Sequence, residues 1–180
     1  MSILTDRLEL IPASSGLLDA AMTSHDALAQ ALDAGLTASW PPEFYGESSI
    51  TYTRTKVAES AGNPEWWMYW FVVREPRRLI GFGGYKGPPS ADGTVEVGYT
   101  VVDDQQRHGY ATEATRGLIA RAFSLPAVSR VVAETMPDLT PSLRVLEKLG
   151  FVFIGPGEEE GAVRYELPRA GFTQRVLTSS

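Results

Sequence analysis

The residues from Val95 to Phe123 constrain the fold more than any other stretch, because a strand, a tight loop and a helix are predicted in direct succession. The strand portion VEVGYTVV is rich in β-branched and aromatic residues and contains no proline. The polar loop DDQQRHG ends in glycine, and from Ala111 onward apolar residues recur at helical spacing. A helix N-terminus behind a glycine presents free backbone N–H groups to an anion such as phosphate. From these residues alone, a phosphate-binding loop and an ordinary strand-to-helix turn are both possible.

Composition narrows the classes of protein that this chain can represent. Its 180 residues predict one domain spanning 1–180. The absence of cysteine excludes disulfides, thiolate metal sites and a cysteine nucleophile, and two histidines exclude a His-rich metal site, so we expect no metal. A net charge of −6 argues against a nucleic-acid-binding surface. No apolar run long enough for a membrane span and no secretory signal are visible, so we expect a cytoplasmic protein without a membrane partner.

The remaining segments predict an α+β protein with a mostly antiparallel sheet of about seven strands and one parallel crossing at the central helix. The aromatic strand predicted at 66–73 is interpreted as buried on both faces, and the alternative is that its rings form a platform for a ligand. Thr140 is a candidate cap and Gly150 the exit of the last helix, and the acidic loop 155–161 is expected to be a solvated hairpin. The predicted strands are 5–10, 66–73, 79–85, 95–102, 130–135, 151–154 and 163–167, and the predicted helices are 15–34, 50–61, 111–123 and 141–149.

Three motifs resemble one known family. Gln106–Ala111 fits the pattern Q/R-x-x-G-x-G/A and resembles the acyl-CoA pyrophosphate loop of the GNAT N-acetyltransferases, and the flanking EVGYTV and ATEA segments match as well. Thr5–Leu10 resembles the T-x-R-L-x-L opening of the ribosomal-protein N-acetyltransferase-like branch. Ser142–Phe151 resembles the S-x-x-V-L-E-K-x-G-F segment of that branch. Leu139 stands where many relatives carry a cofactor-contacting asparagine, so one cofactor contact is missing.

The resemblance implies the GNAT fold over nearly the whole chain, with acetyl-CoA as the acyl donor. The cofactor's pantetheine arm would pair with the central strand, and a backbone N–H near Thr100 to Val102 would stabilise the oxyanion. Arg107 would contact phosphate through its guanidinium or through its backbone alone. The cofactor-binding residues that the resemblance implies are Thr100, Val101, Val102, Gln106, Arg107, His108, Gly109, Tyr110, Ala111 and Ser142.

Transfer of an acetyl group to an amine requires a base, because an ammonium cannot attack a thioester. The resemblance implies Glu96 as this base, on the same strand face as Gly98 and Thr100, and the alternative is an ordinary glutamate on a solvated strand face. Ser142 is the candidate proton donor for the leaving thiolate or a cofactor ligand, and the alternative is a simple helix first-turn hydroxyl.

We therefore expect an N-acetyltransferase that acts, as a monomer or homodimer, on a primary amine of a protein N-terminus or a small molecule. The acceptor pocket is expected at the first two helices and their loop, around Trp40, Glu43 and Tyr45. The main alternative is a non-catalytic acyl-CoA-binding or sensing module, which the missing asparagine favours. A dinucleotide-binding protein is a weaker alternative, because the loop carries a single glycine of G-x-G-x-x-G.

Overall fold

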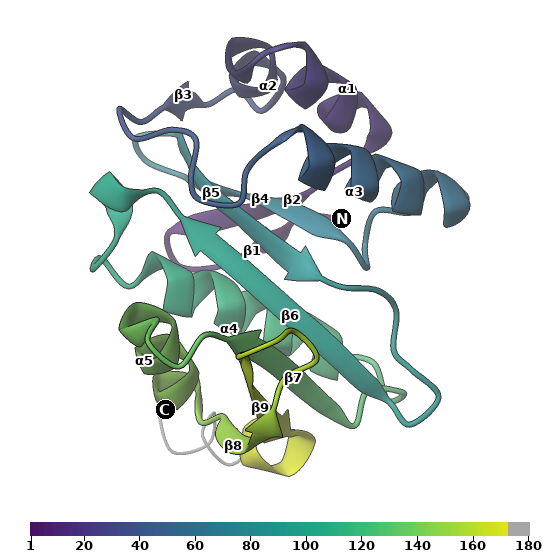
Figure 1. Ribbon diagram of the computed structural model, residues 1–180. Helices are drawn as coiled ribbons and strands as arrows, with labels where there is room; N and C mark the ends of the chain where they lie inside the picture. Colours follow the sequence, from purple (N-terminus) through teal and green to yellow (C-terminus); the bar gives the residue numbers. More distant parts are fainter. Residues whose placement is uncertain (173–180) are drawn as a thin grey trace.

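The computed structural model describes residues 1–172, which form one mixed nine-stranded sheet flanked by helices (Figure 1). The strand order is β1-β2-β4-β5-β6-β7-β9-β8, with β3 paired beside β5. The elements in chain order are β1 (Ile3–Leu4), β2 (Leu8–Pro12), α1 (Ser15–Thr23), α2 (His25–Ala31), β3 (Gly35–Leu36), α3 (Glu47–Glu59), β4 (Met68–Val73), β5 (Arg78–Tyr85), β6 (Thr94–Val101), the 3-10 helix η1 (Asp103–Gln105), α4 (Tyr110–Phe123), β7 (Arg130–Thr135), α5 (Thr140–Leu149), β8 (Val152–Pro156) and β9 (Val163–Pro168).

The α+β class and the mostly antiparallel sheet are confirmed, but the predicted number of strands was too small. The predicted first strand was partly wrong, because the chain turns where Thr5 Oγ1 accepts the Leu8 N–H at 3.1 Å, which leaves β1 and β2 on either side. The predicted helix 15–34 is two helices. Ser24 is extended there and its hydroxyl accepts the Ala27 N–H at 3.0 Å, so this residue caps α2.

The last predicted helix differs at its start and agrees at its end. Thr140 is the first residue of α5 and not its cap; Leu139 occupies the cap position, without a side-chain hydrogen bond. Pro141 lies in the first turn, as expected. Gly150 ends the helix at φ 88°, a left-handed conformation that glycine adopts at low cost.

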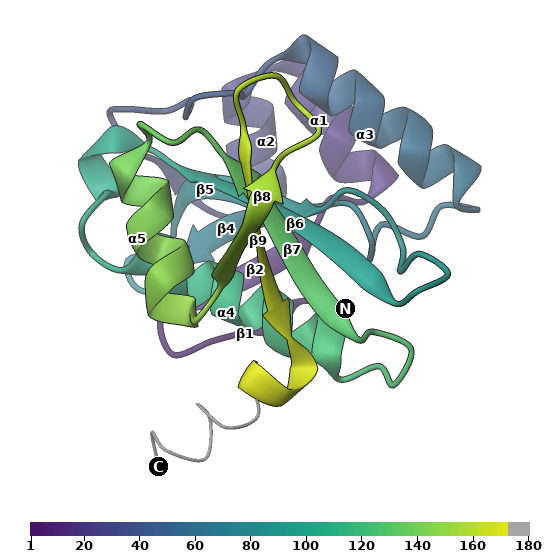
Figure 2. The same cartoon turned by 60° about the horizontal axis from the view of Figure 1, so that its bottom comes forward.

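Two layers of helices cover opposite faces of the sheet, and β4 lies between them (Figure 1). Helices α1, α2 and α3 pack with Trp70 and Val72, whereas α4 and α5 pack with Tyr69 and Phe71. All six residues of β4 are buried, which confirms that the aromatic strand belongs to the core on both faces. The strands at the β8 end of the sheet lie away from α1–α3, so none of the helices within residues 1–172 covers one face of β7 and β9 (Figure 2). Among residues 1–172, each helix is too short or too polar to cross a membrane.

Candidate active site

The strands β6 and β7 separate part of the way along their length and form a fork. Strand β6 pairs with β5 as far as Gly81↔Val101. Its parallel pairing with β7 runs from Thr94↔Arg130 to Glu96↔Val132, although both strands continue beyond that point. The fork therefore closes at Glu96 and opens toward the loop that leads into α4.

The hydrogen-bond register decides which backbone groups of β6 face the fork. Lys86 N–H donates to the Glu96 carbonyl at 3.0 Å, and Val102 N–H donates to the Ile80 carbonyl at 2.9 Å. Because backbone groups alternate sides along a strand, the even-numbered residues 96–102 face β5 and the odd-numbered residues 97–101 face the fork.

Of the three predicted oxyanion donors, Val101 is the one whose N–H faces the fork. Thr100 belongs to the row that faces β5, and both backbone groups of Val102 are occupied, since its carbonyl accepts the Gln105 N–H at 3.0 Å. Tyr99 N–H faces the fork as well. The sequence did not show that the Tyr99 N–H faces the fork, because a strand pattern gives two alternating rows without saying which one pairs with the neighbouring strand.

The loop after β6 is folded against that strand by Gln106. Its side-chain amide donates to the Val101 carbonyl at 3.2 Å and to Asp103 Oδ1 at 2.9 Å. This side chain therefore stabilises the loop by bonding to the end of β6 and to the first residue of η1. Arg107 has φ 65° and Gly109 φ 81°, both left-handed. Such a conformation costs an L-residue about 1–2 kcal/mol, and residues held in it are frequent at ligand-binding loops. His108 is exposed and stacks on Tyr110, with ring centroids 5.9 Å apart.

The N-terminus of α4 presents free donors next to this loop. The first intrahelical bond runs from Glu113 N–H to the Gly109 carbonyl at 3.0 Å, so the N–H groups of Tyr110, Ala111 and Thr112 precede the helical ladder. These groups and the positive end of the helix dipole form a site suited to phosphate.

Glu113 lies in the first turn of α4, and its carboxylate is clamped to the β1–β2 turn. Its carboxylate accepts the Thr5 hydroxyl at 2.6 Å, the Arg7 N–H at 2.7 Å and Arg7 Nε at 2.8 Å. Burial favours its neutral form, but the hydrogen bonds from Thr5 and Arg7 outweigh burial and hold the pKa of Glu113 below its ordinary value. Arg7 also donates to the His108 carbonyl at 3.1 Å, so the turn and the loop are fixed together.

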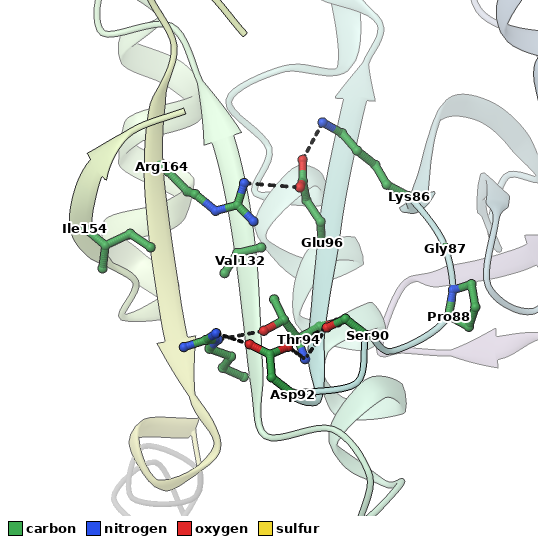
Figure 3. Close-up of a pocket in the computed structure, with 11 residues that line it drawn as sticks. Lys86, Gly87, Pro88, Ser90, Asp92, Thr94, Glu96, Val132, Ile154 and Arg164 are labelled. Carbon is green, nitrogen blue, oxygen red and sulfur yellow. Dashed lines mark hydrogen bonds and ion pairs between the residues drawn. The ribbon is translucent and has the colours of Figure 1, made fainter. Parts of the chain in front are cut away.

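Glu96 lies on the face of β6 opposite α4, together with Gly98 and Thr100, and its side chain is 12% exposed. Its carboxylate contacts Lys86 Nζ and lies 3.7 Å from an Arg164 guanidinium nitrogen (Figure 3). Burial lowers the pKa of Lys86, but the carboxylate of Glu96 outweighs this effect and raises it. Glu96 is therefore a paired carboxylate at the closed end of the fork, neither a freely solvated one nor one standing alone in an apolar site.

Arg164 collects three carboxylates around one guanidinium nitrogen. Besides Glu96, that nitrogen contacts Glu134 and lies 3.1 Å from Glu158. Oxygens of these three glutamates lie within 4.8 Å of one another, a spacing that a metal ion could use. The guanidinium already supplies the positive charge at their centre, so the arrangement is that of an ion-pair network. Glu158, expected in a solvated loop, is exposed but belongs to this network.

Ser142 lies in the first turn of α5 and faces Tyr99 across the fork. The Tyr99 hydroxyl is 3.3 Å from Ser142 Oγ and 3.3 Å from the Ser142 carbonyl. Burial raises the pKa of Tyr99 to about 12, so its phenol stays protonated and can donate at neutral pH. Tyr99 could have been found from the sequence, because it is a polar-tipped ring on the face that Val97 and Val101 bury. Leu139, in place of the asparagine, is 40% exposed.

A cavity of about 330 Å³ lies on the Glu96 face of β6. Its lining is largely aromatic, with small residues on the strand side, and includes Phe44, Tyr52, Trp67, Phe82, Gly98 and Thr100. The predicted acceptor residues come from the adjoining loop but lie differently. Trp40 and Tyr45 pack on each other with centroids 5.2 Å apart, and Glu43 is exposed, whereas Phe44 from the same loop lines the cavity.

Comparison with known proteins identifies the family and the fold of this chain. The acetyltransferase (GNAT) domain model matches residues 7–152. The uncharacterized N-acetyltransferase YjdG of Bacillus subtilis is 31% identical over 148 residues, which cover 82% of this chain and 88% of that protein. The ribosomal-protein-S5-alanine acetyltransferase from Vibrio fischeri shares the fold with a TM-score of 0.67 at 17% identity, covering 96% of this chain and 98% of the other.

The microcin C7 self-immunity acetyltransferase MccE, solved with acetyl-CoA and AMP, also shares the fold, with a TM-score of 0.62 at 17% identity over 91% of this chain and 93% of the other. Both solved structures support the fold alone at such identities. The family model and the relative in Bacillus subtilis carry the assignment further. This chain belongs to the GNAT family of acyl-CoA-dependent N-acetyltransferases.

Proposed function

We propose that residues 1–180 form a single domain that transfers the acetyl group of acetyl-CoA to the primary amine of a protein N-terminus or a small molecule. The observation that carries this proposal is the fork between β6 and β7, which opens beside the N–H groups at the start of α4. The fork offers an unpaired strand edge, and the helix start offers a phosphate site. Acetyl-CoA has both an amide-containing arm and a pyrophosphate, so one extended ligand would use both features.

The pantetheine arm would add to β6 as a strand, using both backbone groups of Tyr99 and the N–H of Val101, because the Val101 carbonyl already accepts from Gln106. The pyrophosphate would accept hydrogen bonds from the N–H groups of Gly109, Tyr110 and Ala111. Glu113 is compatible with this binding mode, because its negative charge is paired with Arg7 and its carboxylate accepts from Thr5. The acetyl group would then lie deep in the fork, toward its closed end.

The acceptor amine would approach from the Glu96 face, through the aromatic cavity. Glu96 would take a proton from the ammonium directly or through a water molecule, and a fork-facing N–H would stabilise the oxyanion. Ser142, held by Tyr99, would return a proton to the departing thiolate. Because the cavity is mainly aromatic, it favours an amine that carries an apolar group.

The test is release of CoA thiol with a panel of amines: peptides differing in their first residue, and small apolar and polar amines. Glu96→Gln keeps the shape and removes the base, so turnover of the best amine at neutral pH should fall by about a hundredfold. The matched control is Glu9→Gln, which removes another strand glutamate paired with an arginine, at 2.8 Å from Arg77, and should leave turnover unchanged. Glu96→Gln turnover within about twofold of wild type would exclude Glu96 as the base.

A further inference from the structure

Lys86 interacts with Glu96 through both its backbone and its side chain, although the side chain is partly exposed. Its backbone N–H bonds to the carbonyl of Glu96, and its Nζ contacts the carboxylate of the same residue. The side chain is 55% exposed and borders two hollows, the aromatic cavity and a polar hollow of about 430 Å³ that Arg164 and Asp92 also line (Figure 3). Lys86 therefore presents a primary amine at the residue where the fork closes.

That amine has the chemistry of an acceptor. The proposed reaction needs a primary amine, a carboxylate in contact with it and an acetyl thioester near the closed end of the fork. Lys86 and Glu96 supply the first two within one chain. We propose that Lys86 Nζ is a self-acetylation site, modified by the acetyl-CoA bound in the fork of the same molecule. This inference rests on the proposed function for the position of the thioester.

The step balances without a further reactant. The Lys86 ammonium gives one proton to the Glu96 carboxylate, and the neutral amine attacks the acetyl carbonyl carbon. A C–N bond forms and the C–S bond breaks, so CoA leaves as a thiolate. The nitrogen loses its second proton, which ends on the thiolate sulfur, and Glu96 releases its proton to solvent. The products are N-acetyl-lysine, CoA and one proton.

The chain contains suitable internal comparisons, because its lysines are Lys56, Lys86 and Lys148. Lys56 pairs with Glu59 at 2.8 Å on α3, and Lys148 is exposed in the last turn of α5. Uncatalysed acetylation favours exposed amines with an ordinary or low pKa. The contact with Glu96 raises the pKa of Lys86, which leaves less free amine at neutral pH and so slows its uncatalysed acetylation.

The experiment incubates the full chain with acetyl-CoA and follows acetylation of each lysine by peptide mass spectrometry. Because the reacting groups are held together, Lys86 should be acetylated at least about tenfold faster than Lys148. The first-order rate constant, measured as the fraction of Lys86 acetylated per unit time, should not change with protein concentration, as expected for a reaction within one molecule. Glu96→Gln should slow Lys86 modification at least about tenfold, while Lys148→Arg should leave it unchanged.

Three results would overturn the inference. Lys86 could be acetylated no faster than Lys148, its first-order rate constant could rise in proportion to protein concentration, or that rate constant could be the same in Glu96→Gln. A parallel measurement of the melting temperature with acetyl-CoA separates this failure from failure of the proposed function. A melting temperature raised by acetyl-CoA with Lys86 unmodified refutes self-acetylation alone. An unchanged melting temperature counts against the cofactor site and the proposal that rests on it.

Discussion

The carboxylate clamp at Glu113 gives the sharpest stability prediction. Glu113→Gln preserves the shape of the side chain but replaces one oxygen by an NH₂ group that faces the guanidinium of Arg7. The hydrogen bonds from the Thr5 hydroxyl and the Arg7 N–H can persist to the amide oxygen, at roughly half the strength of bonds to a charged group. The charged contacts to Arg7 Nε at 2.8 Å and to its terminal nitrogen at 2.7 Å are lost.

Hydrogen bonds to charged groups contribute about 1.5–3 kcal/mol each when shielded from water. Arg7 is 48% exposed and Glu113 15%, so solvent reduces the value of this pair. We expect a loss of about 2 kcal/mol in the free energy of unfolding. It comes from the two contacts to the Arg7 guanidinium, reduced by solvent screening, and from the weaker hydrogen bonds of the Thr5 hydroxyl and the Arg7 N–H. For a chain of this size, that corresponds to a fall of about 4–8 °C in melting temperature.

The matched control is Glu47→Gln, which removes an exposed first-turn glutamate from α3. It loses the interaction with the helix dipole, about 0.3–1 kcal/mol, but no clamp. Urea unfolding of both variants isolates the clamp as the difference between them. If Glu113→Gln cost no more than Glu47→Gln, the clamp would contribute nothing measurable and our reasoning would be wrong.

The pH dependence of this difference provides a second check. The folded-state pKa of Glu113 is lowered, so its stabilisation is fully present above the unfolded-state pKa of about 4.3 and disappears as pH falls through the lower folded-state value. The gap in unfolding free energy between wild type and Glu113→Gln should be constant from about pH 5 to 7. It should shrink as pH decreases below about 4, and a gap that stays unchanged at about pH 3 would refute the assignment.

Three further variants test the kinetic parameters of the reaction. Ser142→Ala should lower the turnover number by about tenfold, less than is usual for acid catalysis because a thiolate leaves readily, and should change acetyl-CoA affinity less. An equal fall in both would make Ser142 a binding group. Tyr99→Phe should then have little added effect in the Ser142→Ala background. Gly98→Val should fold normally, because a Cβ at Gly98 meets no atom within 4 Å, and should raise the acceptor Michaelis constant at least about tenfold by filling the cavity. An unchanged constant would place the acceptor elsewhere.

Local patterns predicted much of the fold. The strand at 68–73 was correctly assigned, because its apolar and aromatic residues favour a buried strand. The helix that ends at Gly150 was also correctly assigned, because proline favours the first turn of a helix and glycine favours its end. The break at Ser24 was missed because alanine and leucine on both sides favour one long helix. The serine hydroxyl that caps α2 was the available signal.

The site was less predictable, because its chemistry depends on pairs that are distant in sequence. The match of Gln106–Ala111 located the loop, but the fold-back of the Gln106 side chain onto Val101 is a tertiary contact. The partners of Glu96 are Lys86, which directly follows β5, and Arg164 on β9, and no spacing in the sequence reveals them. The row of β6 that faces the fork follows from pairing with β5, which again requires the assembled sheet.

We propose that acetyl-CoA fills the fork by pairing with the free edge of β6. Amide hydrogen exchange, measured residue by residue with and without acetyl-CoA, tests this claim directly. We expect slower exchange at Tyr99 and Val101, with little change at Thr100 and Val102, which β5 already protects. Binding of acetyl-CoA that leaves exchange at Tyr99 and Val101 unaltered would contradict it.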